Sequence, residues 1–404
     1  MKTGARITDV KVHLATARWV DDPWVTQALH STALVQIKAD NGLDGWGEVT
    51  LGYFMPESVV PLVAYFAPVL LGRDVMDLSR CVRALYDEAV WWARQGAGRS
   101  AISGIELALW DLKGKTLGLP VYQLLGGAVR DRIPVYASGG SSIWPPEENI
   151  RKLTRYAENG YLAAKLSTGF YEVHATDGPQ QREVEVSLPF GRKITEIEKN
   201  FAALRRELGP GFDLAIDGHQ GGVPEPIPVS EAIEIAEALA PHRLRFYEEP
   251  LAYTDLSGYR ELKARSRIPI AGGESYAGLD QFHAVIAGNA VHVIQPDLGF
   301  VGGLAETLRI IHHADAYNIA TALHTGAAAG PTLAASWHLA AACQSVAWLE
   351  HVVAARSVHA DFLADAFNVR AGTVSLPQAP GLGLKISETL LSKYAFVSGS
   401  GERT

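Results

Sequence analysis

The sequence predicts an α/β barrel of eight β/α units that follows an α+β domain. Eight short apolar runs alternate with segments whose apolar residues recur at helical spacing, as expected for parallel strands joined by right-handed crossovers. A doubly wound sheet more usually has five or six strands and a glycine-rich nucleotide fingerprint, but no G-x-G-x-x-G follows any of these runs. Eight such units are typical of a TIM barrel. The runs are IPVYAS, YLAAKLS, DLAIDGH, LRFYEEP, IPIAGGES, HVIQPD, IATALHT and SVAWLEH.

The first 130 residues are expected to form the α+β domain. In ALVQIKAD, apolar and polar residues alternate ahead of Asn41 and Gly42, a pair that is a strong hairpin signal. The stretch SAISGIELALWDLKGKTLG has apolar residues at helical spacing and Gly118 where a helix should end. An antiparallel sheet followed by helices is therefore predicted.

Composition argues against several classes of partner. The chain has 404 residues, 48% hydrophobic residues and a net charge of −8, whereas binding to nucleic acid needs clustered Lys and Arg. No run approaches the roughly 20 apolar residues of a membrane span. Cys81 and Cys343 lie far apart, which argues against a disulfide framework or a zinc site. We expect a cytoplasmic protein with neither a nucleic-acid nor a membrane partner.

Polar residues stand near the carboxyl ends of the predicted barrel strands. These ends converge on one face of a barrel, where active sites are built. A single carboxylate after a strand is more often a helix cap or a loop residue, but seven consecutive strands with the same feature are difficult to explain in that way. The residues concerned are Lys165, Asp217, His219, Glu248, Glu249, Glu274, Asp297, His324 and Glu350.

The acids Asp217, Glu248 and Glu274, on three successive strands, predict a metal site. Like charges this close need a counter-charge, and an oxygen-rich set without cysteine favours Mg²⁺ over Zn²⁺. The metal would also stabilise the negative charge that forms when a carboxylate substrate loses the proton on the adjacent carbon. Taken alone, the pair Asp217 and His219 could equally bind a metal, transfer protons or simply end a strand.

A general base is predicted on the sixth and seventh strands. Asp297 and His324 would be neighbours there, and a carboxylate beside an imidazole fixes its tautomer and raises its basicity. The alternative is a histidine whose hydrogen bonds are satisfied within a loop.

The motifs that carry these residues resemble those of the enolase superfamily, in its mandelate racemase-like subgroup, over essentially the whole chain. They are GLDGWGE, ALWDLKGKTLGLPVYQLLGG, KLS, IDGH, YEEP, GGES, QPDLGFVGG, HTG, WLEH and PGLGLKI. The resemblance implies a modified (β/α)7β barrel at residues 131–370 and a capping domain at residues 1–130 that is completed by residues 371–404. It also implies Mg²⁺ held by the three acids named above.

The same resemblance bears on the reaction. Racemases of this subgroup have a Lys-x-Lys pair at the end of the second strand, but this chain has Lys165, Leu166 and Ser167 there. Racemisation needs an acid-base group on each face of the substrate, so the missing second lysine disfavours it. Lys165 is expected to contact the substrate carboxylate or a metal-bound oxygen, or to act only as electrostatic support.

The third-strand motif is similar to that of acid-sugar dehydratases related to galactonate dehydratase, in which Asp-x-His supplies a general acid. By this resemblance, His324 removes the proton α to the carboxylate and His219 protonates the departing 3-hydroxyl. Glu350 hydrogen-bonds the substrate carboxylate, a bond that it can donate as a neutral acid. We therefore expect a homo-oligomeric lyase that dehydrates a sugar acid, an aldonate or aldarate, to a 2-keto-3-deoxy sugar acid. A cycloisomerase or epimerase is the alternative, and a non-catalytic sugar-acid-binding paralogue is least favoured.

Further segments are expected around the site. Residues 168–192 form an unusually long connection, either a lid or an oligomer contact. Residues 19–30 and 51–57 are rich in aromatic side chains, and they are expected either to close over the barrel and set specificity or simply to pack against it. Residues of the long connection that would touch substrate or face solvent are His174, Arg182 and Arg192.

Overall fold

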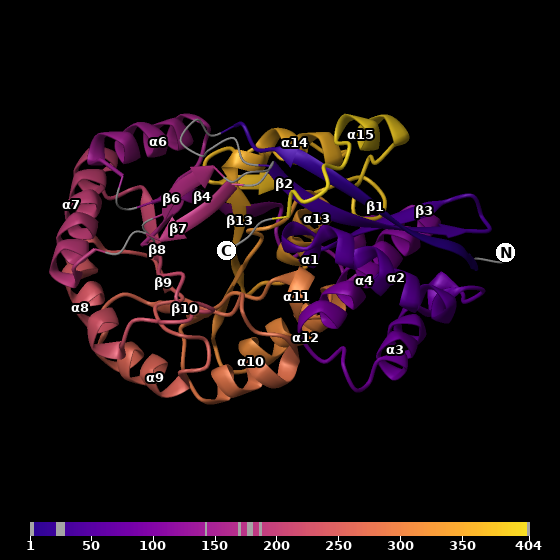
Figure 1. Cartoon of the computed structure of the whole chain (residues 1–404), viewed down its shortest axis with the longest axis horizontal. Coiled ribbons are helices and arrows are strands. Elements are labelled where there is room, and N and C mark those ends of the chain that lie inside the picture. The colour runs from indigo at the N-terminus through magenta and orange to yellow at the C-terminus, as the bar shows by residue number, and fades with distance from the viewer. Residues whose placement is uncertain are drawn as a thin grey trace.

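The computed structural model describes residues 4–21, 29–141, 144–168, 171–175, 181–185 and 188–401. Figure 1 shows a β/α barrel at the left and, at the right, an N-terminal domain of antiparallel strands and helices. The predicted fold, a (β/α)7β barrel with a capping domain, is confirmed. The residue boundaries proposed for the two domains stay a prediction.

The sheet of the capping domain follows from its turn chemistry. The predicted hairpin joins the second and third strands, and its turn contains Gly42 at φ 81°, a conformation that costs glycine little. Asn41 Oδ1 accepts a hydrogen bond from Leu43 N at 3.0 Å, which closes the turn. The antiparallel strands, in spatial order, are β1 (Ile7–Arg18), β2 (Leu29–Ala39) and β3 (Asp44–Val49).

A long helix, α4, lies directly against β3 because strand glycines leave no side chain between them. A Cβ added at Gly47 would lie 2.0 Å from Gly104 O, and one added at Gly45 would lie 2.1 Å from Ala108 O. As predicted, α4 ends before Gly118, whose φ of 68° is left-handed. The helices of this domain are α1 (Leu51–Phe54), α2 (Pro56–Leu70), the 3₁₀ helix η1 (Val75–Asp77), α3 (Leu78–Glu88), α4 (Gly96–Leu117) and α5 (Val121–Leu124).

Replacing Gly47 with Ala is expected to lower the free energy of unfolding by about 3 kcal/mol, since the methyl group must push α4 away from β3. The control is Gly191→Ala in the first turn of helix α7 (Phe190–Leu208), where a Cβ would meet no atom within 4 Å. Urea unfolding measures both variants. Equal midpoints for Gly47→Ala and wild type would show that the strand and helix separate without cost.

Eight parallel strands close the barrel, because β13 pairs with β4 as well as with β12. Each strand lies within one of the eight predicted apolar runs or overlaps it. The strands are β4 (Arg132–Ser141), β5 (Ala163–Ser167), β8 (Asp213–Asp217), β9 (Tyr247–Glu248), β10 (Ile270–Gly272), β11 (Val293–Ile294), β12 (Ala320–Leu323) and β13 (Val346–Val352).

Helices connect consecutive strands, and α6 to α10 form the outer rim at the left of Figure 1. The connecting helices are α6 (Pro146–Glu158), α7 (Phe190–Leu208), α8 (Val229–Leu239), α9 (Leu256–Arg265), α10 (Gly278–Ala287), α12 (Leu304–Asp315) and α13 (Pro331–Ala342). Two short helices accompany them, η2 (Ala240–His242) and α11 (Leu298–Val301).

Two segments depart from the repeating pattern. The connection after β5 contains an antiparallel hairpin of β6 (Tyr171–Ala175) and β7 (Gln181–Glu185). After β13 the chain returns to the capping domain, where Ala395 forms a bridge with Ala15 of β1. On the way, strand β14 (Thr373–Ser375) pairs antiparallel with the start of β4. The elements of this return are η3 (Val353–Ala355), α14 (Arg356–Phe362), β14 (Thr373–Ser375) and α15 (Glu388–Lys393).

Strand alternation divides the barrel interior into an apolar floor and a charged layer. Residues two apart on a strand face the same side, so Ala215 and Asp217 of β8 both point inward, as do Phe246 and Glu248 at β9. Ala215 and Phe246 belong to a buried apolar cluster. The acids follow them toward the carboxyl ends of the strands and are also buried. The charged layer therefore lies at the catalytic end of a β/α barrel.

Among the described residues, no helix combines the length and the apolar character needed to cross a bilayer.

Candidate active site

Lys165 lies at the centre of the charged layer and bridges carboxylates from three other strands. Its Nζ is 2.6 Å from Glu248 Oε1, 3.0 Å from Asp217 Oδ2 and 3.1 Å from Glu350 Oε1. All four side chains are buried. The structure thus brings together the predicted residues of β5, β8, β9 and β13, and it supports a role for Lys165 as the local counter-charge.

One ammonium group does not balance this cluster. Burial lowers the pKa of Lys165, but the charges of Asp217, Glu248 and Glu350 outweigh that effect and raise the pKa well above its ordinary value. Burial raises the pKa of Glu248 to about 8 and the pKa of Glu274 to about 7. Both shifts show that ionised carboxylates are costly here without further positive charge.

His324 and Asp297 form the predicted dyad. His324 Nδ1 is 2.8 Å from Asp297 Oδ2, and because an ionised carboxylate only accepts, Nδ1 carries the proton. Asp297 Oδ1 accepts a hydrogen bond from Gly299 N at 2.7 Å, which fixes the carboxylate. His324 Nε2 consequently faces the charged layer, 3.0 Å from Glu274 Oε2 and 3.8 Å from Glu350 Oε2.

The charges around His324 favour its protonated form. Burial lowers the pKa of His324, but Glu274, Glu350 and Asp297 together raise it well above its ordinary value. Glu350 shows the opposite balance: burial raises its pKa, and Lys165 and His324 lower it to about 2. The structure therefore favours the anionic form of Glu350.

Donor atoms of Glu248, Glu274 and His324 lie within 4.8 Å of one another and could hold a metal ion. Among the described residues, Glu274 Oε2 is buried and accepts no hydrogen bond, although it contacts His324 Nε2. The oxygens of Asp217 instead contact Lys165 Nζ, His219 N at 3.0 Å and His219 Nε2 at 3.2 Å. The predicted set of three carboxylates thus shares Glu248 and Glu274 with this group, and the role of all three as metal ligands stays a prediction.

His219 lies beside Asp217 at the rim of the charged layer. Its backbone is left-handed, with φ 50°, and its Nδ1 is 3.4 Å from Ser167 Oγ. Asp217 raises the pKa of His219 above its ordinary value, and 44% of the side chain is exposed. The side chain of His219 is thus more exposed than that of His324, of which 13% is exposed.

Gln295 is a site residue that the sequence analysis missed. Its Nε2 donates to Glu248 Oε2 at 2.5 Å, so it orients a predicted metal ligand. The signal was present in the QPD motif: Gln295 precedes Asp297 by two residues, and both therefore face the interior. Glu249, in contrast, is hydrogen-bonded to Ser275, whose Oγ donates to Glu249 Oε1 at 2.8 Å, and it is not among the carboxylates that contact Lys165 in the described part of the chain.

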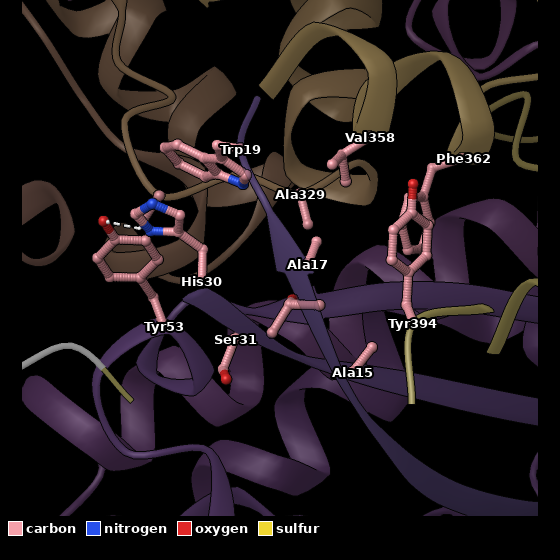
Figure 2. A pocket seen from close by; sticks show the side chains of 12 residues that line it. Ala15, Ala17, Trp19, His30, Ser31, Tyr53, Ala329, Val358, Phe362 and Tyr394 are labelled. Carbon is pink, nitrogen blue, oxygen red and sulfur yellow. Dashed lines mark hydrogen bonds between the residues drawn. The ribbon is translucent and has the colours of Figure 1, made fainter. Parts of the chain in front are cut away.

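The capping domain contacts the barrel beside this site. Trp19 stacks on His30 with ring centroids 3.8 Å apart, and His30 Nδ1 is 3.1 Å from Tyr53 Oη. Figure 2 shows that these aromatic side chains and Ala329 of the barrel line the same pocket. Residues 22–28 lie outside the described part of the chain, as do the side chains of His174 and Arg182. Arg192 is exposed on α7.

Comparison with known proteins assigns the family. Residues 8–126 match the model of the mandelate racemase / muconate lactonizing enzyme N-terminal domain, and residues 149–390 match the enolase C-terminal domain-like model. The chain belongs to the enolase superfamily, in its mandelate racemase subgroup.

Both dehydratases and cycloisomerases are among the similar proteins of this family. D-galactonate dehydratase of Variovorax paradoxus is 31% identical over 95% of this chain and 92% of its own length. D-galactarolactone cycloisomerase of Agrobacterium fabrum is 29% identical over 96% of this chain and 98% of its own length. The solved structure of 3,6-anhydro-D-galactonate cycloisomerase from Zobellia galactanivorans has a TM-score of 0.80 and 27% identity, and covers 96% of this chain and 99% of that one.

Proposed function

We propose that the protein is a Mg²⁺-dependent hydro-lyase that converts an aldonate or aldarate into a 2-keto-3-deoxy sugar acid. One observation carries the proposal. A histidine-aspartate dyad and a second histidine, His219, adjoin one buried carboxylate cluster, while Ser167 stands where a racemase has its second lysine. Elimination needs one base and one acid at different atoms of the substrate, and this set provides both.

The acids of the charged layer fit a hard divalent cation. They supply oxygen donors without cysteine, and Lys165 alone does not neutralise them. Asp217, Glu248 and Glu274 would hold Mg²⁺, with Gln295 orienting Glu248. When bound, the ion would neutralise the substrate carboxylate and the negative charge that develops beside it.

His324 removes the α-proton. Its Nδ1–H is held by Asp297, so Nε2 is the nitrogen that receives the proton. His324 must be neutral on Nε2 to accept this proton, and a cation held by Glu274 would offset part of the negative charge that raises the pKa of His324. The carboxylates beside the ring then stabilise the imidazolium that results. Glu350 Oε2 accepts a hydrogen bond from Thr325 N at 2.8 Å and is thereby held beside this histidine.

His219 then donates a proton to the departing 3-hydroxyl. Asp217 keeps this imidazole protonated through the contact of Oδ2 with Nε2, and the side chain is 44% exposed. Loss of the proton from C2 and of hydroxide, as water, from C3 leaves an enol, which becomes the 2-keto acid.

Replacing His219 with Asn is expected to lower the rate of water loss by about 100-fold or more, the contribution of a positioned general acid. Exchange of the α-proton with D₂O should persist, because His324 is unchanged. A library of aldonates and aldarates, with Mg²⁺ and with semicarbazide to trap keto products, identifies the substrate first. Full elimination activity in His219→Asn would falsify the assignment of this residue as the acid.

A cycloisomerase is the second candidate, because relatives with that name align over nearly the whole chain. An elimination whose leaving oxygen belongs to a ring of the same substrate opens the ring and releases no water. The mass of the product decides between the two: a dehydratase product is lighter than its substrate by one water, and a cycloisomerase product has the same mass.

A further inference from the structure

The loop of residues 325–330 joins β12 to α13 and packs against the imidazole of His324. A Cβ added at Gly326 would lie 2.8 Å from His324 Nε2 and 2.9 Å from His324 Cε1. There is thus no room for a methyl group between the loop backbone and the nitrogen that receives the proton. The glycine backbone is therefore packed near the ring, so that a shift of the loop toward His324 would displace the imidazole and a shift away from it would uncover the imidazole.

Glu48 of the capping domain holds the far end of this loop. Its Oε1 accepts hydrogen bonds from Ala329 N at 2.7 Å and from Thr32 Oγ1 at 2.7 Å, and its Oε2 accepts from Gly330 N at 3.3 Å and Thr332 N at 3.1 Å. The first N–H groups of a helix lack partners within it and attract negative charge. A buried carboxylate from another domain therefore caps α13 and anchors the loop.

A chain of buried side chains holds the same loop from the barrel side. His359 Nε2 is 2.9 Å from Ala328 O, and since a carbonyl only accepts, this nitrogen donates. His359 Nδ1 must then accept from His351 Nε2, 3.1 Å away, and His351 Nδ1 must accept from the hydroxyl of Tyr161.

The direction of each hydrogen bond in this series of side chains is therefore fixed when both histidines are neutral. Burial lowers the pKa of His359 to about 4 and that of His351 well below its ordinary value, so both rings are neutral, as the arrangement requires.

We propose that Glu48 and His359 are positioning residues for His324: they hold loop 325–330 from two sides, and through Gly326 the loop fixes the imidazole. The inference rests on the proposed function in taking His324 as the base. Neither Glu48 nor His359 has a role in the proposed dehydration steps. Neither lies among the side chains that contact the charged layer.

The first test needs no substrate. It compares Glu48→Gln, which keeps the shape but places an amide against backbone N–H groups, with His359→Leu, which removes the donor to Ala328 O. The control is Asp111→Asn. Asp111 is also a buried carboxylate of the capping domain, but its backbone partners are Trp46 N and Leu382 N, each at 2.8 Å.

Two readouts are measured by mass spectrometry: amide hydrogen exchange in peptides that span residues 324–333, and the rate at which diethyl pyrocarbonate modifies His324. Both rates are expected to rise by at least about threefold in Glu48→Gln and His359→Leu, because local opening becomes easier. Asp111→Asn should stay within about twofold of wild type in both. Faster exchange in the loop with an unchanged rate at His324 would overturn the proposal, and so would equal effects in all three variants.

Turnover supplies the second test. With the substrate that the library of sugar acids identifies, kcat should fall by about tenfold or more in Glu48→Gln while KM stays within about threefold of wild type. The reason is that misplacing a catalytic group affects the chemical step. Glu48→Asp should recover part of kcat. If Glu48→Gln does not fold, His359→Leu and Glu48→Asp decide both tests. A wild-type protein without turnover on any sugar acid would overturn the proposed function, and the labelling of His324 would still decide this inference.

Discussion

Asparagine in place of His324 is expected to lower kcat by about 10³-fold or more, toward the upper range for a general base. Exchange of the substrate α-proton with D₂O should disappear together with product formation, because both begin with the same proton transfer. The rates are measured by NMR of the α-proton and by trapping of the keto acid. This pairing separates His324 from His219, whose loss leaves the exchange intact.

Asp297→Asn serves as the companion variant. An amide can present its NH₂ group to His324 Nδ1 and so favour the tautomer with the proton on Nε2, which no longer accepts. A loss similar to that in His324→Asn is expected, with thermal unfolding close to wild type as the check on folding. An α-proton that still exchanges at the wild-type rate in His324→Asn would mean that another group is the base.

Glutamine in place of Glu248 is expected to weaken Mg²⁺ binding by at least about 100-fold. Removing a residue that only orients a metal ligand lowers the affinity by about 10- to 100-fold, and removing the ligand itself should lower it further. The variant loses the charged oxygens on which Lys165 and Gln295 converge. Titration calorimetry measures the affinity, and EDTA should abolish wild-type turnover until Mg²⁺ is restored.

The adjacent carboxylate provides the control. Glu249 is buried and one residue away, but its hydrogen bond is to Ser275 and not to Lys165 or Gln295, and a glutamine can keep that hydrogen bond. Glu249→Gln should therefore bind Mg²⁺ within about threefold of wild type. Equal losses in the two variants, or wild-type activity that survives EDTA, would contradict the metal site.

The barrel and the convergence of its polar residues were predictable because they depend on local patterns. The run DLAIDGH contains apolar residues, then Asp217 at the position where the strand ends, and the alternation of side chains decides that Asp217 points inward. The turn at Gly42 and the end of α4 at Gly118 follow in the same way from residues that accept a positive φ.

The hairpin after β5 was expected only as a long loop. The first strand, YEVHA, does alternate between apolar and polar residues, but its partner, QREVE, has one apolar residue. A strand that offers no apolar face gives little sign of its register. Only the first of the two segments therefore carries the alternation that predicts a strand, and the sequence alone did not predict the hairpin.

The positions of individual atoms in the site were beyond the sequence. It could place Lys165 and the acids around one cavity, but not show that one ammonium contacts three of them. It could place Glu48 in a strand, but its partner Ala329 is 281 residues away and belongs to the other domain. Contacts of this kind depend on how two separately predictable parts pack together.

The return of the chain to its beginning limits how this protein can recombine with its relatives. Ala395 pairs with Ala15, and the hydroxyl of Ser400 lies 2.6 Å from Ser31 Oγ and 3.1 Å from Thr16 Oγ1, inside the capping domain. A single crossover near residue 130 would combine the N-terminal part of the capping domain from one parent with the C-terminal part of the capping domain from the other. Functional chimeras are therefore expected to need two crossovers, so that both ends of the gene are inherited together.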